Sequence, residues 1–174
     1  MPPPFSVKLL PHDLSWASRA AQEIQRLKDH VSSICMVHHV GSTAIPGIAA
    51  KPILDLMPVV VSLTALDAER AIFETLGYSW HGAYGLAGRR YCTMDDTLTG
   101  QRIIQLHCFP DGDSSVLRHV AFRDYLRANA DIAREYEREK YRCASLYAGD
   151  SHAYGDCKDA WIRRIEALAL RFEQ

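Results

Sequence analysis

Apolar residues recur along this chain with two different periods, and these periods predict an order of helices and strands. Residues 13–31 carry apolar side chains at helical spacing. Two short apolar runs, 34–40 and 53–61, are typical of strands. Residues 63–76 return to helical spacing and stop at Gly77. The first half of the chain is therefore predicted to be helix, strand, strand, helix.

The second half of the chain begins with strand signals and ends with helical ones. Residues 78–80 begin a strand or loop, and residues 89–93 and 102–109 are expected to pair as a hairpin around a turn. From Ser114 onward no strand pattern occurs. Three helices are expected there, at residues 116–128, at residues 131–147, and from Asp150 or Ser151 onward.

The same periodicity predicts which side chains are buried. The stripe of the first helix comprises Leu14, Ala17, Ala21, Ile24, Leu27 and Val31. Trp16 lies off this stripe, where we expect it to pack on the proline-rich arm at residues 1–11. The buried side of the last helix is predicted to comprise Tyr154, Trp161, Ile165, Leu168 and Phe172.

The order of these elements indicates the fold class. Mixed strands followed by a helical run favour an α+β fold. The 174 residues suit one domain, residues 1–174, with a core at about 13–110 and a helical C-terminal part at about 114–174.

Composition narrows the class of protein. Hydrophobic residues make up 48% of the chain and charged residues 24%, which is typical of a soluble globular protein. The formal net charge of −1 provides no overall field that would attract nucleic acid or an anionic membrane. The start of the chain lacks the apolar core of a signal peptide, and no run reaches the roughly 18 apolar residues of a membrane span. We therefore expect a cytoplasmic protein without a membrane or nucleic-acid partner, and the oligomeric state is left open.

The cysteines were a second indication of the compartment. They are Cys35, Cys92, Cys108, Cys143 and Cys157. The number is odd and no CxxC spacing occurs, so neither a zinc site nor a redox pair is indicated. Several lie in apolar patterns, and we interpret them as buried free thiols in a reducing compartment.

The stretch that follows the first predicted strand concentrates the candidate chemistry. Gly41 permits a positive φ and close backbone approach, while Ser42 and Thr43 offer the donors that a phosphate needs. Lys51 adds a positive charge, and Asp55, a lone carboxylate in an apolar run, is a hard ligand of the kind that Mg²⁺ prefers. These residues predict a nucleotide-phosphate site in which Lys51 and Asp55 are the catalytic candidates. The alternative is a glycine-rich turn with a solvated lysine and an aspartate satisfied by backbone N–H groups.

Other charged residues allow more than one interpretation. His38 and His39 point to opposite faces of a strand, so we expect only one of them to face the site. Arg90 is a candidate for bidentate phosphate binding. Charge on an exposed edge strand also prevents unwanted pairing, and this is our interpretation of Arg102.

Several segments together resemble the GrpB family. The specific segment is HVGSTAIPGIAAKPILDL, at residues 39–56. The supporting segments are LHCF at 106–109, FRDYLR at 122–127, the Tyr136 and Lys140 pair, and AYGDCKDAWI at 153–162. The resemblance covers nearly the whole chain, and the family is similar in fold to the nucleotidyltransferase superfamily. It implies a mixed sheet flanked by helices, with further helices appended at the C-terminus.

The resemblance also implies a triphosphate at the glycine–serine turn and a divalent metal at Asp55. In the wider superfamily two carboxylates spaced i, i+2 hold Mg²⁺, and a third lies on a neighbouring strand. Here the second position is Met57, and the third falls near Gln105 or His107. A thioether does not replace a carboxylate for Mg²⁺, which puts a two-metal mechanism in question. Asp55 and His107 are instead expected to hold one divalent ion (Mg²⁺, Mn²⁺ or Zn²⁺) or, alternatively, to hydrogen-bond each other without a metal.

The resemblance adds ligand-binding candidates on the C-terminal helices. They are Arg123, Tyr136, Lys140 and Lys158, although helix lysines are commonly only solvated. The expected function is binding of a nucleotide or another phosphorylated small molecule, with transfer of a nucleotidyl or phosphoryl group if Asp55 holds a divalent ion. The alternative is a ligand-binding or regulatory module that has kept the phosphate cradle and lost the full metal set, which Met57 favours.

Overall fold

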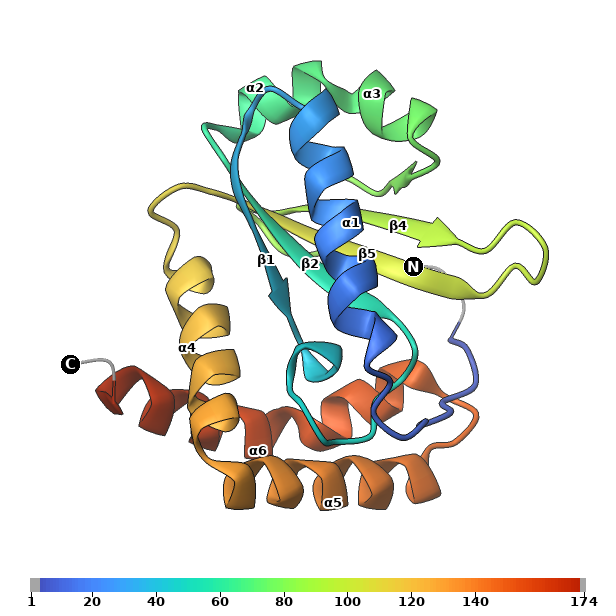
Figure 1. Cartoon of the computed structure of the whole chain (residues 1–174), viewed down its shortest axis with the longest axis vertical. Coiled ribbons are helices and arrows are strands. Elements are labelled where there is room, and N and C mark those ends of the chain that lie inside the picture. Colours follow the sequence, from blue (N-terminus) through green and yellow to red (C-terminus); the bar gives the residue numbers. More distant parts are fainter. Residues whose placement is uncertain (1–3, 173–174) are drawn as a thin grey trace.

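A five-stranded mixed sheet with the strand order β1-β2-β5-β4-β3 forms the centre of the fold (Figure 1). The computed structural model describes residues 4–172. The strands are β1 (Ile34–Val40), β2 (Leu54–Val60), β3 (Ser79–Trp80), β4 (Arg90–Asp95) and β5 (Arg102–Pro110). β2 and β5 run parallel, and the other neighbouring pairs are antiparallel. This mixed sheet with its helices confirms the predicted α+β class.

Helices lie on both faces and at both ends of the sheet, and Val116 and Val120 pack on the face opposite the first helix. The helices are α1 (Ser15–His30), the short 3₁₀ helix η1 (Ser42–Ala44), α2 (Leu63–Ala68), α3 (Arg70–Thr75), α4 (Ser114–Ala128), α5 (Ala130–Leu146) and α6 (Ser151–Phe172). Helix α1 crosses one face of the sheet, α2 and α3 lie at one end, and α5 and α6 run along the other end (Figure 1). Between Ser114 and Phe172 the described chain forms helices and no strand, which confirms the prediction for this region. Within residues 4–172, no helix combines the length and the apolarity that crossing a membrane requires.

Alternation along β2 sends its side chains into two different environments. Leu54, Leu56 and Val60 point into the main core, which the sheet shares with α1. Met57 belongs to a smaller apolar cluster, and Asp55 lines a pocket. The strand therefore contributes both to the core and to the candidate site.

Helix α1 buries a different stripe from the predicted one. Asp13 Oδ1 accepts a hydrogen bond from the Ser15 N–H at 2.8 Å, and the helix begins at Ser15. Leu14 therefore precedes the helix, and 86% of it is exposed. Trp16 is only 1% exposed and belongs to the main core. The prediction that Leu14 is buried and that Trp16 lies off the stripe is wrong, because the face of the helix that packs on the sheet carries Trp16, Ala20 and Leu27. Ala17 and Ala21 of the predicted stripe are exposed as well.

The described part of the N-terminal arm is held against the rest of the protein. Leu10 forms a β-bridge with Ala50, and the Val7 N–H donates to the Ala148 carbonyl at 2.7 Å. Residues 1–3 of the predicted arm lie outside the described residues.

The helix predicted at residues 63–76 is divided at Glu69, which separates α2 from α3 with φ −97° and ψ 8°. The Glu69 carboxylate accepts hydrogen bonds from the N–H groups of Ser32 at 2.9 Å and Ser33 at 3.0 Å. These contacts fix Glu69 against the turn between α1 and β1. The helix is therefore interrupted at the residue whose side chain contacts Ser32 and Ser33, and the sequence of residues 63–76 does not predict this contact.

Helix α6 buries only part of its predicted apolar side. Tyr154 and Ile165 are each 1% exposed, as expected, whereas Leu168 and Phe172 are exposed. The last turns of α6 project past α5 (Figure 1). Near the end of α6 the buried side carries Ala169, which is 0% exposed, and Phe172 lies against the Tyr125 ring, with 5.7 Å between the ring centroids.

The cysteines do not all match the prediction of buried free thiols. Cys143 on α5 and Cys157 on α6 form a disulfide across 14 residues of sequence. Cys92 and Cys108 are buried and free, and Cys35 is free but exposed. The prediction is thus wrong for three of the five, because the packing of α5 against α6 brings two distant cysteines together. A disulfide does not support the predicted reducing compartment.

Candidate functional site

A pocket opens where the central sheet meets the C-terminal helices. It encloses about 500 Å³ when its open mouth is counted. The residues predicted from the sequence that line it are Gly41, Ser42, Thr43, Lys51, Asp55, Tyr136, Lys140 and Lys158. The remaining lining residues are Ile53, Gln105 and Tyr154. The pocket therefore combines the η1 turn and the sheet with two helices that lie far away in the sequence.

Gly41 brings the backbone of the η1 turn against Asp55. It precedes η1 with φ 71° and ψ −172°, a conformation that is essentially restricted to glycine. A Cβ atom at this position would lie 2.6 Å from Asp55 Oδ2. Close approach of the turn to the carboxylate therefore requires a residue without a side chain.

Asp55 and His107 form a pair on neighbouring strands. Asp55 pairs with Gln105 in the parallel register of β2 and β5, so His107, two residues further along, lies on the same face. His107 Nε2 is 3.2 Å from Asp55 Oδ1, and because a carboxylate only accepts, the imidazole N–H donates. The two side chains therefore share one face of the sheet, and the hydrogen bond that was predicted as the alternative to a shared ion is present.

Asp55 is ionised in this setting. Burial raises its pKa, but the hydrogen bond from His107 and the positive charges of Lys51 and Lys158 outweigh burial and hold the pKa below its usual value. The Asp55 side chain remains 30% exposed. A charged carboxylate therefore faces the pocket and remains accessible.

Three lysines converge on the same pocket. Burial lowers the pKa of Lys51 and of Lys158 to about 8 each, and that of Lys140 to about 7. Lys140 is 1% exposed, and its ammonium donates to the Ala49 carbonyl. Asp55 is the only carboxylate among the residues that line the pocket. The pocket is cationic on balance whenever its lysines are protonated.

Two tyrosines support the lysines from α5 and α6. The Lys158 ammonium lies 4.1 Å from the centroid of the Tyr154 ring, and Lys51 lies 5.5 Å from the same centroid. Lys140 lies 4.8 Å from the centroid of Tyr136. Such cation–π contacts offset part of the cost of removing an ammonium from water. The sequence analysis did not assign Tyr154 to the site, although its i, i+4 spacing to Lys158 places both on one face of the last helix.

Thr43 is tied to the preceding strand. His39 Nε2 lies 2.8 Å from Thr43 Oγ1, and burial lowers the pKa of His39 to about 4. A neutral imidazole therefore holds the η1 turn at neutral pH. The Thr43 hydroxyl is thus already hydrogen-bonded to His39.

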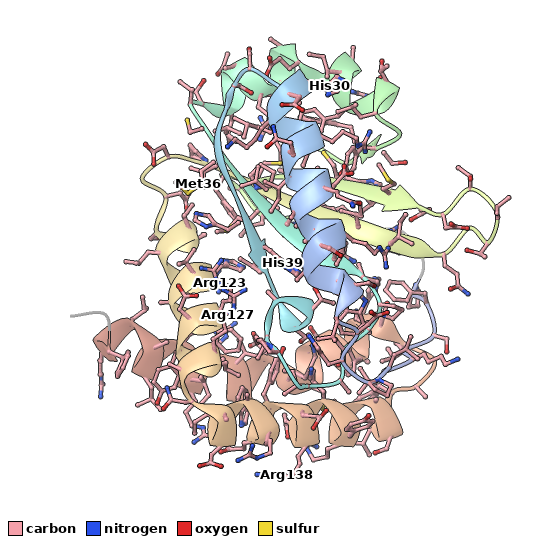
Figure 2. The ribbon with its side chains drawn as sticks, viewed as in Figure 1. His30, Met36, His39, Arg123, Arg127 and Arg138 are labelled. Atoms are coloured by element: carbon pink, nitrogen blue, oxygen red, sulfur yellow. A yellow bond between two sulfur atoms is a disulfide. The ribbon has the colours of Figure 1, made fainter. Side chains whose placement is uncertain are left out.

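The structure does not bring two of the predicted ligand-binding arginines into the pocket. Arg90 forms a bidentate pair with Asp67 of α2, with Nε and Nη2 each 2.6 Å from a carboxylate oxygen. Arg123 of α4 donates to the His39 carbonyl at 3.1 Å and to Asp124 (Figure 2). Its neighbour Arg127 donates to the Ala44 carbonyl at 2.8 Å. Arg123 and Arg127 thus hold the backbone of β1 and η1 in place, and Arg90 connects β4 to α2.

The residues of the pocket do not fit a two-metal centre. Met57, at the second carboxylate position, is fully buried with Val40 and Phe109. Gln105 lines the pocket near the third position. Over residues 4–172, the one group of three potential metal ligands lies elsewhere, at Glu139 and the two disulfide-bonded cysteines. Only Asp55 and His107 remain as a donor pair for a single ion.

The comparison with protein families is decisive at this point. The family model described as "GrpB protein" matches residues 6–168. The chain belongs to the GrpB family. It is 35% identical to the UPF0157 protein YqkA of Bacillus subtilis over 173 residues, which cover 99% of this chain and 50% of YqkA. The chain therefore spans only half the length of that relative.

Solved structures agree with this family and extend the likeness in fold. The crystal structure of the conserved protein GrpB from Enterococcus faecalis has a TM-score of 0.87 and 34% identity, covering 95% of this chain and 99% of the other. The structure of Cid1, a poly(U) polymerase, has a TM-score of 0.55 and 15% identity, covering 86% of this chain and 48% of Cid1. At that identity the second likeness concerns the fold alone. The GrpB chain therefore has a nucleotidyltransferase-like fold, as the resemblance in sequence implied.

Proposed function

We propose that the pocket binds the phosphate groups of a nucleotide or of another phosphorylated small molecule. The observation that carries this proposal is the convergence of Lys51, Lys140 and Lys158 on one pocket. Their lowered pKa values reflect the cost of keeping three ammonium groups in partly dehydrated surroundings. A polyanion placed among them would offset that cost through charge-assisted hydrogen bonds.

The η1 turn adds neutral donors to this cationic wall. The Ala44 and Ile45 N–H groups are used within the turn, where they donate to the carbonyls of Gly41 and Ser42. The N–H groups of Ser42 and Thr43 precede these bonds, and both residues line the pocket. Backbone donors at the beginning of a turn and lysines from two helices together form an arrangement suited to several phosphate oxygens.

A more specific question is whether the pocket also transfers a nucleotidyl or phosphoryl group. A single divalent ion held by Asp55 and His107 would supply Lewis-acid stabilisation of a phosphoryl oxygen. The buried Met57 argues against the complete carboxylate set that two ions need. We therefore propose phosphate binding as the primary function, with nucleotidyl or phosphoryl transfer confined to a one-ion site at Asp55.

Replacing Asp55 by asparagine distinguishes these possibilities by the sign of the effect. If the lysines alone bind the anion, Asp55→Asn removes a repelling charge and should strengthen metal-free binding of a nucleoside triphosphate roughly three- to tenfold. If a bound ion mediates binding, the variant should lose the increase in affinity that Mg²⁺ or Mn²⁺ provides. Isothermal titration in EDTA and in each metal measures both.

The matched control for this experiment is Asp131→Asn, because the Asp131 side chain is 92% exposed on α5. This variant should bind as the wild type does. No binding of nucleoside triphosphate or inorganic tripolyphosphate to the wild-type protein, with or without metal, would contradict the proposal.

The lysine pKa values make a second prediction, which concerns pH. Affinity for a nucleoside triphosphate should fall at least about tenfold between about pH 6.5 and about pH 9, because Lys51, Lys140 and Lys158 lose protons in that range. A terminal phosphate with a pKa of about 6 only gains charge over the same interval, so the ligand cannot cause the fall.

Stability of the free protein should change in the opposite direction. Between about pH 7 and about pH 10 the unfolded chain binds more protons at these lysines than the native protein does, so their contribution makes the free energy of unfolding rise with pH. Lys158→Met should make both dependences shallower. An affinity that stays constant across this range would contradict the assignment of the lysines to the binding site.

A further inference from the structure

A second pocket lies directly beside the first. It encloses about 570 Å³ with its open mouth counted, within the range of about 300–1,000 Å³ that is typical of small-molecule sites. Lys51 and Gln105 line both pockets. The other residues that line it are Phe5, Tyr84, Tyr91, Arg102, Ser151 and His152. A ligand that passes Lys51 and Gln105 would occupy both spaces at once.

One wall of the second pocket is a stack of aromatic rings that leads to the candidate site. The rings of Tyr84 and Tyr91 stack with their centroids 4.8 Å apart and an angle of 23° between their planes. Tyr91 in turn lies 5.3 Å from His107, measured between ring centroids, and His107 donates to Asp55. Tyr91 is buried, whereas Tyr84 is partly exposed at the end of the stack. Tyr84 also lies 5.7 Å from His81, measured between ring centroids, and it keeps exposed surface at the second pocket.

The loop that carries Tyr84 is held in an unusual conformation. Tyr84 has φ 48°, a positive value that residues other than glycine rarely adopt. Arg89 Nη2 donates to the Tyr84 carbonyl at 2.9 Å, and its guanidinium lies 5.1 Å from the centroid of Tyr91. Strain of this kind persists where surrounding contacts impose it, and it concentrates at ligand sites. Arg89 thus fixes the backbone that presents the Tyr84 ring.

A third aromatic ring, that of Phe5, reaches this pocket from the beginning of the chain. The Phe5 N–H donates to Ser151 Oγ at 3.2 Å, and the Ser151 N–H donates to the Phe5 carbonyl at 3.1 Å. These reciprocal bonds attach the N-terminal arm to the first turn of α6. The Lys51 ammonium lies 5.1 Å from the centroid of the Phe5 ring. Lys51 therefore stands between the aromatic second pocket and the cationic first one.

We infer that the second pocket binds the aromatic base of a nucleotide whose phosphates occupy the first pocket. This inference rests on the proposed phosphate site and narrows its ligand from phosphorylated molecules in general to nucleotides. The planar face of a base can stack on Tyr84, because every base offers a π-face to an aromatic ring. Arg102 lies on the central strand β5, so its interpretation as an edge-strand charge is wrong, and its Nε donates to Asp95 at 2.7 Å. Arg102 and the Gln105 amide line the same space and offer hydrogen-bonding groups for the edge of the base. A phosphorylated ligand without an aromatic group would leave this wall unused.

The experiment compares two anions and three variants by isothermal titration. Wild-type protein should bind a nucleoside triphosphate at least about tenfold more tightly than inorganic tripolyphosphate. Tyr84→Leu should weaken nucleoside triphosphate binding about five- to hundredfold, the range for loss of base–aromatic stacking, and leave tripolyphosphate binding within about twofold. Tyr84→Phe retains the ring and should retain the affinity. Tyr141→Leu is the matched control, because Tyr141 is exposed on α5.

The outcomes separate this inference from the proposed function. If both anions bind equally and Tyr84→Leu changes neither affinity, the base pocket is excluded and the phosphate site stands. If neither anion binds to the wild type, both proposals are overturned. Equal losses of both ligands in Tyr84→Leu would also overturn the inference, and melting temperatures of all three variants show whether such losses come from unfolding.

Discussion

Gly41→Ala is expected to abolish detectable phosphate binding and to destabilise the protein by about 2–6 kcal/mol. The destabilisation combines about 1–3 kcal/mol for a side chain at a glycine-only backbone conformation with about 1–3 kcal/mol for overpacking. The overpacking arises because the new Cβ would lie 2.6 Å from Asp55 Oδ2 and 3.0 Å from Asp55 Cβ. Relief requires the η1 turn or the Asp55 side chain to move, and either displacement disorders the pocket. Losing two charge-assisted bonds of about 1.5–3 kcal/mol each lowers affinity by a factor of at least about a hundred.

Gly47→Ala is the control for this prediction. Gly47 also has a positive φ, of 79°, but a Cβ there would meet nothing within 4 Å. The control therefore carries the backbone strain without the contact to Asp55. Chemical denaturation and isothermal titration of both variants measure the difference. If Gly41→Ala binds a nucleoside triphosphate as tightly as Gly47→Ala does, the close approach of the turn to Asp55 has no role in binding.

Lys51→Met is expected to weaken phosphate binding about ten- to hundredfold while it changes stability little. A lysine–phosphate contact is a charge-assisted hydrogen bond worth about 1.5–3 kcal/mol when it is partly dehydrated, and each 1.4 kcal/mol is a factor of ten. Methionine keeps most of the apolar stem that packs near Phe5 and Tyr154. Burial lowers the pKa of Lys51 to about 8, which reflects the free-energy cost of burying its charge. Replacing the ammonium removes that cost, so the melting temperature should not fall.

The control for Lys51 is Lys28→Met, an exposed lysine in the last turn of α1. It should alter neither affinity nor melting temperature. A large fall in melting temperature for Lys51→Met would mean that Lys51 is structural, as the partner that offsets the charge of Asp55. Unchanged affinity with unchanged melting would remove Lys51 from the phosphate site.

The sequence by itself determined much of the sheet and the motif that the pocket is built on. β1 begins and ends at the residues that its apolar run predicted, because a short run of β-branched and apolar residues before a glycine leaves few alternatives. Alternation with period two was sufficient to place Asp55 and His107 on one face, since it is a property of the extended backbone itself. The glycine before Ser42 likewise indicated a turn with positive φ.

The tertiary structure alone decided what surrounds that motif. Arg90 was a phosphate candidate by residue type, but Asp67 lies 23 residues earlier and only the packing of α2 against the sheet makes them partners. Cys143 and Cys157 form their disulfide for the same reason, across the interface of α5 and α6. Helical period predicts an apolar stripe, but it does not decide which of two neighbouring stripes packs on the sheet, as Leu14 and Trp16 demonstrate.

The three lysines of the pocket also come together only through the packing of separate elements. Lys140 contacts the Ala49 carbonyl across 91 residues of sequence, and Lys158 and Tyr154 come from another helix again. The hydrophobic pattern of a segment predicts its secondary structure and which of its faces is apolar, because both depend on residues that are close in sequence. Distances between charged groups on separate elements, and the pKa shifts that follow from shared burial, depend on how the elements pack. The sequence thus determined the turn and the carboxylate, and only the packing of α5 and α6 against them produced a pocket with three lysines.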